Sequence, residues 1–312
     1  MTKTLTRDSC DTTNQPPPTP FDPSKLSTTA MAFDEIQYPP GFGYKDLVAW
    51  GSTGLVVLDR ATQTVIKSPF NPENGSPIAR EREIYERLAE RGRHQGTLLY
   101  HGEFEGGGIR LEYASNLDLQ SFVQREEVGP ALRLHWMIQL ADALAFVHDA
   151  RIIHGDFTTA NVFLDDGLNA RLADFAGSSI DSSRLLVEVT ASHLYPGNLL
   201  SAQGDIFAFG SVMYELGTGK RPYAGLSETD IKSLFQRGEF PDVTSLASLG
   251  RIIRTCWEGG YDDSKTLVKD LQLIRDTPST APDASSLAHF LVGLAAIVLA
   301  GLIWTRSARA AR

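Results

Sequence analysis

An acid, an amide and a second acid recur at fixed spacing in the middle of this 312-residue chain. Asp156 and Asn161 lie in the stretch His-Gly-Asp-Phe-Thr-Thr-Ala-Asn at 154–161, and Asp174 follows thirteen residues after Asn161. Phosphoryl transfer needs one group that orients the attacking hydroxyl and oxygen ligands that hold Mg²⁺ on a nucleotide. The three side chains supply that set, although taken alone they are more typical of solvated turns. The interpretation therefore depends on the rest of the chain.

The two stretches resemble the catalytic loop and the magnesium-binding loop of eukaryotic protein kinases. The first is similar to the pattern His-Arg-Asp, four residues, Asn, and the Asp-Phe-Ala-Gly sequence at 174–177 is similar to Asp-Phe-Gly. The resemblance covers roughly residues 40–275. It implies that Asp156 orients the substrate hydroxyl, that Asn161 and Asp174 hold Mg²⁺, and that ATP donates its γ-phosphate.

Short apolar runs before the catalytic stretch predict strands. Three of them lie within residues 46–67, and two more lie near residues 98–100 and 109–111. They are rich in Val, Ile and Leu and are separated by short, turn-rich segments. The first part of the chain is therefore expected to form a small sheet.

Helical signals dominate the rest of the chain. Ser76 followed by proline begins a predicted helix, and Gly92 ends it. From Leu119 onward, apolar periodicity predicts a mainly helical region. The predicted fold class is α+β, a two-lobed kinase-like domain at 36–275 whose β-rich N-lobe extends to about residue 114. The larger helical C-lobe would cover residues 115–275, with ligands in the cleft between the lobes.

The sequence Ala-Trp-Gly-Ser-Thr-Gly-Leu-Val at 49–56 resembles the kinase glycine-rich loop, with Ala49 in place of its first glycine. Gly51 and Gly54 would let backbone amides approach phosphate groups. Two glycines also fit a simple hairpin turn. Lys67 favours the resemblance, because it ends an apolar strand where an unpaired ammonium would be costly to bury.

Glu81 is the expected partner of Lys67. Glu81, Ile84, Tyr85 and Leu88 are spaced at i, i+3, i+4 and i+7, which places Glu81 on the apolar stripe of the predicted helix. An acid on a buried stripe needs a cation, whereas an ordinary surface glutamate does not. The pair resembles the kinase ion pair that positions the lysine on the α- and β-phosphates.

The segment from Leu111 to Asp118 resembles the kinase hinge. By this resemblance Leu111 is the gatekeeper, the backbone of Glu112 and Ala114 meets adenine, and Asp118 lies near the ribose. Each residue alone would fit an ordinary core or surface position, so their order along the chain carries the interpretation. The apolar side chains expected to enclose the base are Val56, Val65 and Phe163.

Several positions depart from the family pattern. Gly155 stands where kinases usually carry the arginine that binds an activation-loop phosphate, so we expect activity to be independent of phosphorylation in that loop. Thr158 replaces a lysine that contacts the γ-phosphate, and Ala176 replaces a glycine. The Leu-Tyr-Pro-Gly sequence at 194–197 lies where Ala-Pro-Glu is usual, and the arginine partner of that glutamate is also missing.

Asp205 begins an apolar block that resembles the organising helix of the kinase C-lobe. Such an acid is expected to accept hydrogen bonds from catalytic-loop amides, and a helix N-terminus favours an anion. Its predicted role is structural support.

Charge and cysteine content exclude some classes. A net charge of −9 argues against a nucleic-acid partner, which would need a basic surface. Two cysteines, Cys10 and Cys256, cannot form a disulfide framework, which suits a reducing compartment. The N-terminus lacks the apolar segment of a secretory signal.

The two ends of the chain differ from its middle. Residues 1–35, rich in Pro and Thr, are predicted to be disordered, and residues 276–286 to be a polar linker. Residues 287–304 are apolar except for His289, and as a helix they would span about 27 Å, close to the hydrocarbon core. We expect a single transmembrane helix that binds the lipid bilayer, with the kinase domain in the cytosol and a basic tail at 305–312. The mitochondrial outer membrane is preferred to the endoplasmic reticulum, and a buried core helix is the alternative.

The predicted function is that of a protein kinase that uses ATP and Mg²⁺ on a protein substrate, with Ser or Thr as the default acceptor. A membrane-anchored pseudokinase that binds nucleotide without turnover is the main alternative, favoured by Ala49, Gly155 and Thr158. A small-molecule phosphotransferase of related fold is a third, because such enzymes share the His-Gly-Asp sequence.

Overall fold

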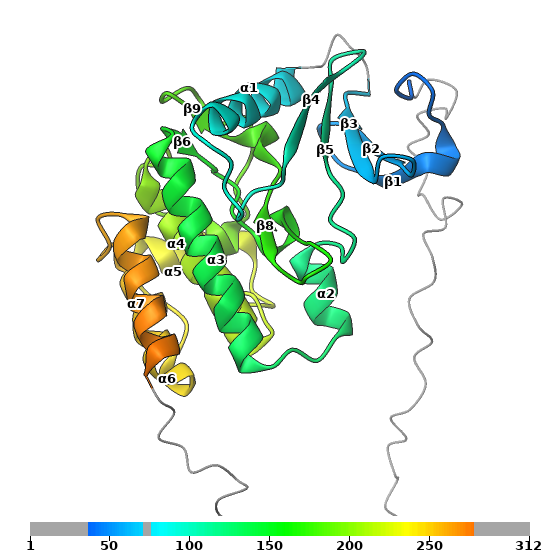
Figure 1. Cartoon of the computed structure of the whole chain (residues 1–312). Helices are drawn as coiled ribbons and strands as arrows, with labels where there is room; N and C mark the ends of the chain where they lie inside the picture. Colours follow the sequence, from blue (N-terminus) through cyan, green and yellow to red (C-terminus); the bar gives the residue numbers. More distant parts are fainter. Residues whose placement is uncertain (1–36, 71–75, 278–312) are drawn as a thin grey trace, which may run out of the picture. The chain divides into compact units, whose positions relative to one another are not determined.

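Five antiparallel strands form the sheet of the N-terminal half (Figure 1). The computed structural model of the protein describes residues 37–70 and 76–277. The strand order is β1-β2-β3-β5-β4, and a 3-10 turn at Tyr44–Asp46 precedes it. The strands are β1 (Leu47–Trp50), β2 (Leu55–Asp59), β3 (Thr64–Ser68), β4 (Tyr100–Phe104) and β5 (Gly108–Glu112). The sheet expected from the apolar runs is therefore present.

β4 begins later than the apolar run at 98–100 predicts. The amide of Leu98 donates to the carbonyl of Leu172 at 3.2 Å, and the amide of Leu99 donates to the Glu112 carboxylate at 3.0 Å. The first bond leads to β8 in the C-terminal half, and the second leads to a side chain of β5 instead of a backbone carbonyl. Residues 98 and 99 therefore precede the regular ladder with β5, which starts at Tyr100.

Helix α1 (Ser76–Glu90) packs on the sheet through one apolar face. That face buries Ile78, Ile84, Tyr85 and Leu88, and Glu81 is buried among them. Ser76 is the first helical residue, where the sequence predicted a capping residue. The helix stops close to Gly92, whose φ of +100° is the left-handed conformation that glycine adopts at low cost.

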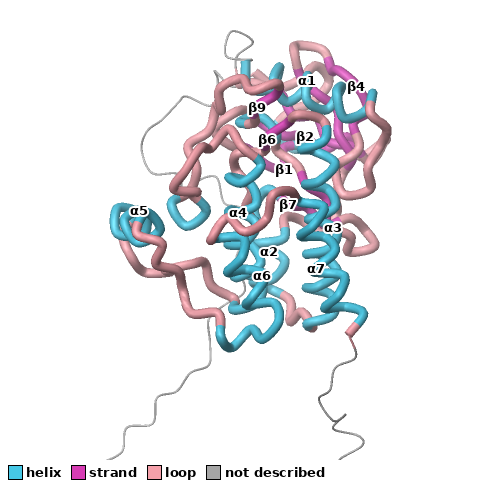
Figure 2. The backbone as a smooth tube through the Cα atoms, turned by 90° about the vertical axis from the view of Figure 1, so that its left-hand side faces the viewer, coloured by secondary structure: helices cyan, strands magenta, loops and turns pink. Residues whose placement is uncertain are grey.

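The C-terminal half is mainly helical, as predicted. The helices α3 and α7 lie side by side, and α4 packs against both α3 and α6 (Figure 2). The helices are α2 (Leu119–Arg125), α3 (Pro130–Asp149), α4 (Ala202–Thr218), α5 (Glu228–Gln236), α6 (Ala247–Trp257) and α7 (Ser264–Asp276). Eleven residues of α4 are buried, which makes it a central element of this half.

Two short strand pairs interrupt the helical region, and the sequence did not predict them. The strand β6 (Ile152–Ile153) pairs with β9 (Ser179–Ile180), and β7 (Val162–Leu164) pairs with β8 (Ala170–Leu172). Strands of two or three residues are too short to show an alternating pattern. Together they bracket the catalytic stretch. Short 3-10 turns lie at Thr159–Asn161, Phe175–Gly177, Ala191–His193 and Thr244–Leu246.

The Asp205 carboxylate of α4 connects α3 with the catalytic stretch. It accepts hydrogen bonds from the amides of His154 and Gly155, both at 2.8 Å, and it contacts Nε2 of His148 at 2.9 Å. Burial favours the neutral acid, but these bonds outweigh burial and lower the Asp205 pKa. Asp205 is 1% exposed, so the catalytic stretch is anchored to α4 by a buried anion.

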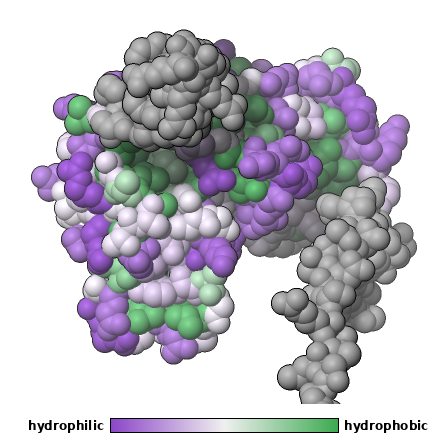
Figure 3. Space-filling model, turned by 90° about the horizontal axis from the view of Figure 1, so that it is seen from below, coloured by the Kyte–Doolittle hydropathy of each residue, from purple (hydrophilic) through white to green (hydrophobic). Residues whose placement is uncertain are grey.

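Hydrophilic and hydrophobic residues are mixed over the coloured part of the face shown in Figure 3. Large exposed hydrophobic side chains come from separate elements, for example Val48 of β1 and Leu273 of α7. Scattered residues of this kind are normal for protein surfaces.

Within residues 37–70 and 76–277, no helix is long and apolar enough to cross a membrane. The predicted disordered tail at 1–35 and the predicted span at 287–304 lie outside the residues that the structure describes.

Candidate active site

Lys67 contacts two carboxylates at once. Its Nζ lies 2.6 Å from Oε2 of Glu81 and 2.6 Å from Oδ1 of Asp174. β3 places the lysine opposite Ile109 of β5, and the buried face of α1 places the glutamate. The structure therefore contains the predicted pair with Glu81 and adds Asp174 as a second partner.

The electrostatics of this cluster favour the ionised forms of Lys67 and Asp174, whereas burial raises the Glu81 pKa against the opposing charge of Lys67. Burial alone would lower the Lys67 pKa, but the charges of Glu81 and Asp174 outweigh it and raise that pKa. Burial likewise opposes ionisation of Asp174, yet the Lys67 ammonium lowers the Asp174 pKa. The lysine remains a cation and Asp174 an anion, which are the states needed to bind phosphate and metal respectively.

Asp156 and Asn161 are joined in the catalytic stretch. The Asn161 side-chain amide donates to the Asp156 carbonyl at 2.8 Å and to its carboxylate Oδ2 at 2.9 Å. Burial raises the Asp156 pKa, and this bond opposes the rise. Asp156 is thus oriented and half-buried, as a group that positions a substrate hydroxyl would be.

The donor set fits Mg²⁺. Because Nδ2 of Asn161 is engaged with Asp156, its Oδ1 is left for a cation, and Asp174 has Oδ2 left beside the Oδ1 that contacts Lys67. Two oxygens with water and nucleotide phosphates are a usual magnesium environment. No group of three His, Cys, Asp or Glu residues in the described part of the chain could hold a metal by itself.

An aromatic stack connects α1 with the catalytic stretch, and the sequence did not predict it. The ring of Phe175 lies 5.3 Å from that of Tyr85 in an edge-on arrangement and 5.1 Å from that of His154. Tyr85 in turn stacks on Tyr100 of β4 at 5.8 Å. The backbone amide of Phe175 also donates to Glu81 at 3.3 Å. The residue after Asp174 is therefore fixed from both halves of the fold.

The two glycines of the predicted phosphate loop differ in their surroundings. The amide of Gly51 donates to the carbonyl of Gly54 at 2.9 Å, which closes the turn between β1 and β2. A Cβ on Gly54 would lie 2.1 Å from the Ser68 carbonyl oxygen, so only glycine fits there. A Cβ on Gly51 would meet nothing within 4 Å, so that position is open. Packing explains Gly54, while phosphate binding by Gly51 stays a prediction.

The predicted adenine-binding residues lie around the connection between the two halves. Leu111 is buried on β5 next to Val65 of β3. The Glu112 amide is occupied, since it donates to the Leu99 carbonyl at 2.8 Å, and the contact of the Glu112 backbone with adenine stays a prediction. Ala114 follows, 7% exposed. The remaining two apolar residues, both half-buried, are Val56 and Phe163.

Asp118 has a structural role that the sequence did not predict. Its carboxylate caps α2 by accepting from the Ser121 amide at 2.8 Å, and its backbone forms a bridge with Phe163. A cap of this kind stabilises a helix by roughly 1 kcal/mol. The predicted position near the ribose is compatible with the cap but stays a prediction.

Comparison with known proteins decides the family. The family model for protein tyrosine and serine/threonine kinases matches residues 101–269, more than half of the chain. The chain belongs to this kinase family. The matched range contains Asp156, Asn161 and Asp174, whereas Lys67 and Glu81 lie before it.

Curated relatives of this kinase carry both tyrosine and serine/threonine names. The megakaryocyte-associated tyrosine-protein kinase of Mus musculus is 26% identical over 175 residues, which cover 52% of this chain and 34% of that protein. A probable serine/threonine-protein kinase of Dictyostelium discoideum is 29% identical over 156 residues, 45% of this chain and 16% of that protein. Salt tolerance receptor-like cytoplasmic kinase 1 of Oryza sativa subsp. japonica is 28% identical over 224 residues, 62% and 60% of the two chains. The matched part of this chain thus spans 34% and 16% of the length of the first two relatives.

The activation segment of the kinase, which we define as residues 174–205, is held by apolar contacts where the family arginine is absent. Gly155 has a φ of +75°, and a Cβ there would lie 2.4 Å from Cδ2 of Leu185. The amide of Leu186 donates to the Gly177 carbonyl at 2.8 Å, and Val187 fills the space beside Gly177. Leu185 therefore occupies the space into which a side chain at position 155 would project.

Arg80 of α1 forms hydrogen bonds with the same segment. Its Nη1 donates to the Ser178 carbonyl at 3.0 Å and to the Ser183 hydroxyl at 2.7 Å. Arg87, two turns further along α1, forms an ion pair with Asp181 at 2.9 Å. Unmodified side chains thus fix this part of the segment to α1.

Gly155→Ala should destabilise the kinase more than Gly219→Ala does. Both glycines have a φ of +75°, but Gly219 has no neighbour within 4 Å of an added Cβ. The shared backbone strain is about 1–2 kcal/mol, and overpacking against Leu185 adds about 1–3 kcal/mol for Gly155→Ala. The free energy of unfolding in urea measures both changes.

The same measurement in a Leu185→Ala background isolates the packing. There the two glycine substitutions should destabilise the protein equally, because the obstructing side chain is gone. An undiminished excess for Gly155→Ala in that background would show that Leu185 is not the cause.

Proposed function

We propose that this chain is an active protein kinase that transfers the γ-phosphate of ATP to a protein hydroxyl. The observation that carries the proposal is the simultaneous contact of Lys67 with Glu81 and Asp174 at 2.6 Å each. This contact joins the sheet, α1 and the magnesium loop in one arrangement. Asp156, the residue that would act on the acceptor hydroxyl, is held by Asn161 at 2.9 Å in the same half of the fold as Asp174, which favours turnover over nucleotide binding alone.

Each residue has a defined task in this proposal. Lys67 binds the α- and β-phosphates, with Glu81 fixing its direction. Asp156 orients the acceptor hydroxyl and receives its proton, while Asn161 holds Asp156 in place. Bound Mg²⁺, held by Asn161 and Asp174, would neutralise charge on the phosphate oxygens. Gly51, Gly54, Val56, Val65, Leu111, Glu112, Ala114, Asp118 and Phe163 form the nucleotide-binding set.

The activation segment supports activity without phosphorylation. Leu185 packs at Gly155, where the family arginine would bind a phosphate, and Arg80 already donates to the unmodified Ser183. The ordered segment therefore uses contacts that need no added charge. The proposed acceptor is Ser or Thr by default, because Thr158 matches neither the usual Ser/Thr nor the usual Tyr signature. The relatives carry both kinds of name, so the assay includes all three acceptors.

Asp156→Asn should lower the rate of phosphate transfer by about 10²–10⁴-fold, because an amide cannot accept the hydroxyl proton. The assay uses the full chain after phosphatase treatment, labelled ATP, Mg²⁺, and peptide libraries with a single Ser, Thr or Tyr. The control is Asp262→Asn, which makes the same change at an exposed carboxylate in the loop between α6 and α7.

The outcomes separate the alternatives. Equal rates for wild type and Asp156→Asn would contradict the assigned base, and ATP binding with no transfer to any library would favour the pseudokinase. Activity that disappears on phosphatase treatment would contradict the independence from loop phosphorylation.

We further propose that residues 287–304 anchor the protein to a membrane, either the mitochondrial outer membrane or the endoplasmic reticulum. The kinase domain, residues 36–275, would then lie in the cytosol. The support is the apolar run of the sequence, with residues 276–286 as a linker and a basic tail after it.

Two lysines in the span should release the full chain from membranes. Leu294→Lys with Ile297→Lys costs about 2.5–3.5 kcal/mol per charge in the centre of a span, whereas Leu294→Ala with Ile297→Ala keeps the run apolar. Membrane and soluble fractions of cells that express each full-length chain, with an N-terminal fluorescent reporter, give the comparison. Wild type in the soluble fraction would exclude the anchor.

A further inference from the structure

A cavity lies away from most of the predicted nucleotide-binding residues. It has a volume of about 260 Å³ and is formed by the last turns of α1, the connection from α1 to β4, and Arg171 of β8. Of the nucleotide-binding set, Glu112 alone lines it, and its carboxylate is turned toward the Leu99 amide. A volume somewhat below the roughly 300–1,000 Å³ of drug-sized pockets suits a small molecule.

The walls of the cavity are apolar and partly aromatic. Leu88 and Leu98 are 4% and 6% exposed, and the rings of Tyr85 and Tyr100 stack at 5.8 Å with an interplanar angle of 10°. A cavity of about 150 Å³ with such walls already accommodates benzene. One or two fused rings would therefore fill this one.

Two of the side chains that line the cavity carry hydrogen-bond donors without a partner. In the described part of the chain, the Tyr85 hydroxyl and the Arg171 Nε are buried without a hydrogen-bond partner. Burial, together with the carboxylates of Glu81, Asp174 and Glu112, raises the Tyr85 pKa well above its usual range, so this hydroxyl keeps its proton. Other buried atoms of the described residues also have no partner, but these two belong to side chains that line one cavity, where a ligand with acceptor atoms would satisfy both.

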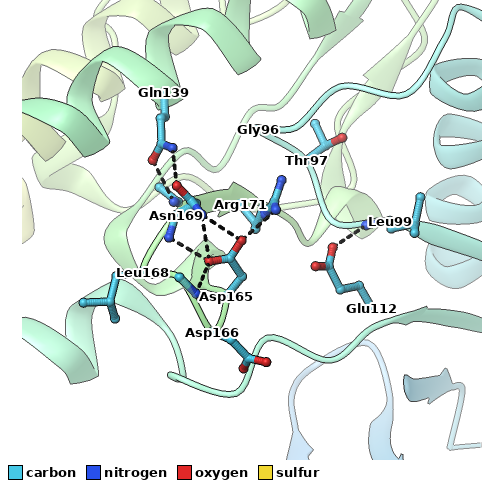
Figure 4. A network of polar contacts seen from close by, with 12 residues as sticks. Gly96, Thr97, Leu99, Glu112, Gln139, Asp165, Asp166, Leu168, Asn169 and Arg171 are labelled. Atoms are coloured by element: carbon cyan, nitrogen blue, oxygen red, sulfur yellow. Dashed lines mark hydrogen bonds and ion pairs between the residues drawn. The ribbon is translucent and has the colours of Figure 1, made fainter. Parts of the chain in front are cut away.

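The charge of the lining favours an anion. Arg93 is exposed and has no ion pair among the residues that the structure describes, and Arg171 is a second arginine in the lining. Glu112 is the acid in the lining, and one of its oxygens already accepts from Leu99. Figure 4 shows that Arg171 lies between Asp165 and Leu99, and Asp165 binds its Nη2 at 2.7 Å. This fixed guanidinium is a preorganised neighbour for a carboxylate.

We propose that this cavity is a second ligand site, which binds a small aromatic carboxylate and is coupled to the nucleotide cleft through Tyr85. The ring of the ligand packs on Tyr100 and Leu98, and its carboxylate meets Arg93 and Arg171. Tyr85 also contacts Phe175, the neighbour of Asp174, so occupancy restrains the residues that hold the predicted metal ligand. The coupling rests on the nucleotide site proposed above, whereas binding of the carboxylate does not.

Isothermal titration of 2-naphthoate into the full chain tests the site. Ala89→Phe fills the mouth of the cavity from the exposed side of α1 and should weaken binding by at least about tenfold, because the ring occupies the ligand volume. Ala131→Phe, which adds the same ring on an exposed alanine of α3 outside the lining, should leave the Kd unchanged. Equal Kd values for Ala89→Phe and wild type, or no saturable binding to wild type, would overturn the site.

The charge of the ligand is tested on Arg93, which is exposed and can be changed without disturbing the fold. Arg93→Gln should weaken 2-naphthoate binding about tenfold and leave the binding of naphthalene-2-carboxamide unchanged, since hydrogen bonds to charged groups are the stronger ones. Equal losses for both compounds would contradict recognition of the carboxylate.

Titration of Mg·ADP with and without saturating 2-naphthoate tests the coupling. The Kd for Mg·ADP should change, and the Kd for 2-naphthoate should change by the same factor in the reverse experiment, as linkage requires. Mutually exclusive binding would place 2-naphthoate in the nucleotide cleft and overturn the second site. Unchanged Kd values would overturn the coupling, and absent Mg·ADP binding would instead count against the proposed function.

Discussion

The whole site depends on one buried cation between two anions. Lys67 is 8% exposed and Glu81 is 1% exposed, so each charge would be costly without its partner. The lysine comes from β3, the glutamate from α1, and Asp174 from the loop after β8, which belongs to the other half of the fold. Satisfying the ammonium therefore requires the sheet, the helix and the magnesium loop to meet at one point.

Other contacts keep that point in place. Tyr85 is one turn along α1 from Glu81 and meets Phe175, the residue that follows Asp174. Phe175 also meets His154, whose amide is held by Asp205 at the start of α4. A rotation of α1 would thus disturb the ion pair and the aromatic stack together. The arrangement is cooperative because the same helix carries both contacts.

The sequence predicted these features to different degrees, for physical reasons. The pairing of Lys67 with Glu81 could be anticipated because a charge on an apolar stripe demands a partner. Tyr85 was assigned only to that stripe, since periodicity shows that a residue is buried and does not show which ring it touches. The packing of Leu185 against Gly155 could not be predicted, because a glycine in the sequence does not indicate which side chain fills the space beside it. The strand pairs around the catalytic stretch were too short for any pattern, and the catalytic roles of the site residues stay predictions.

The central claim is that Lys67, Asp174 and Asn161 together make a magnesium-dependent nucleotide site. The most direct test is the Kd of a non-hydrolysable ATP analogue for the full chain, measured with Mg²⁺ and with a chelator, in wild type and in Asp174→Asn. The account predicts tighter binding with Mg²⁺ in wild type and loss of that difference in Asp174→Asn, because the metal would have lost its charged ligand. Equal affinities of wild type with and without Mg²⁺ would contradict it.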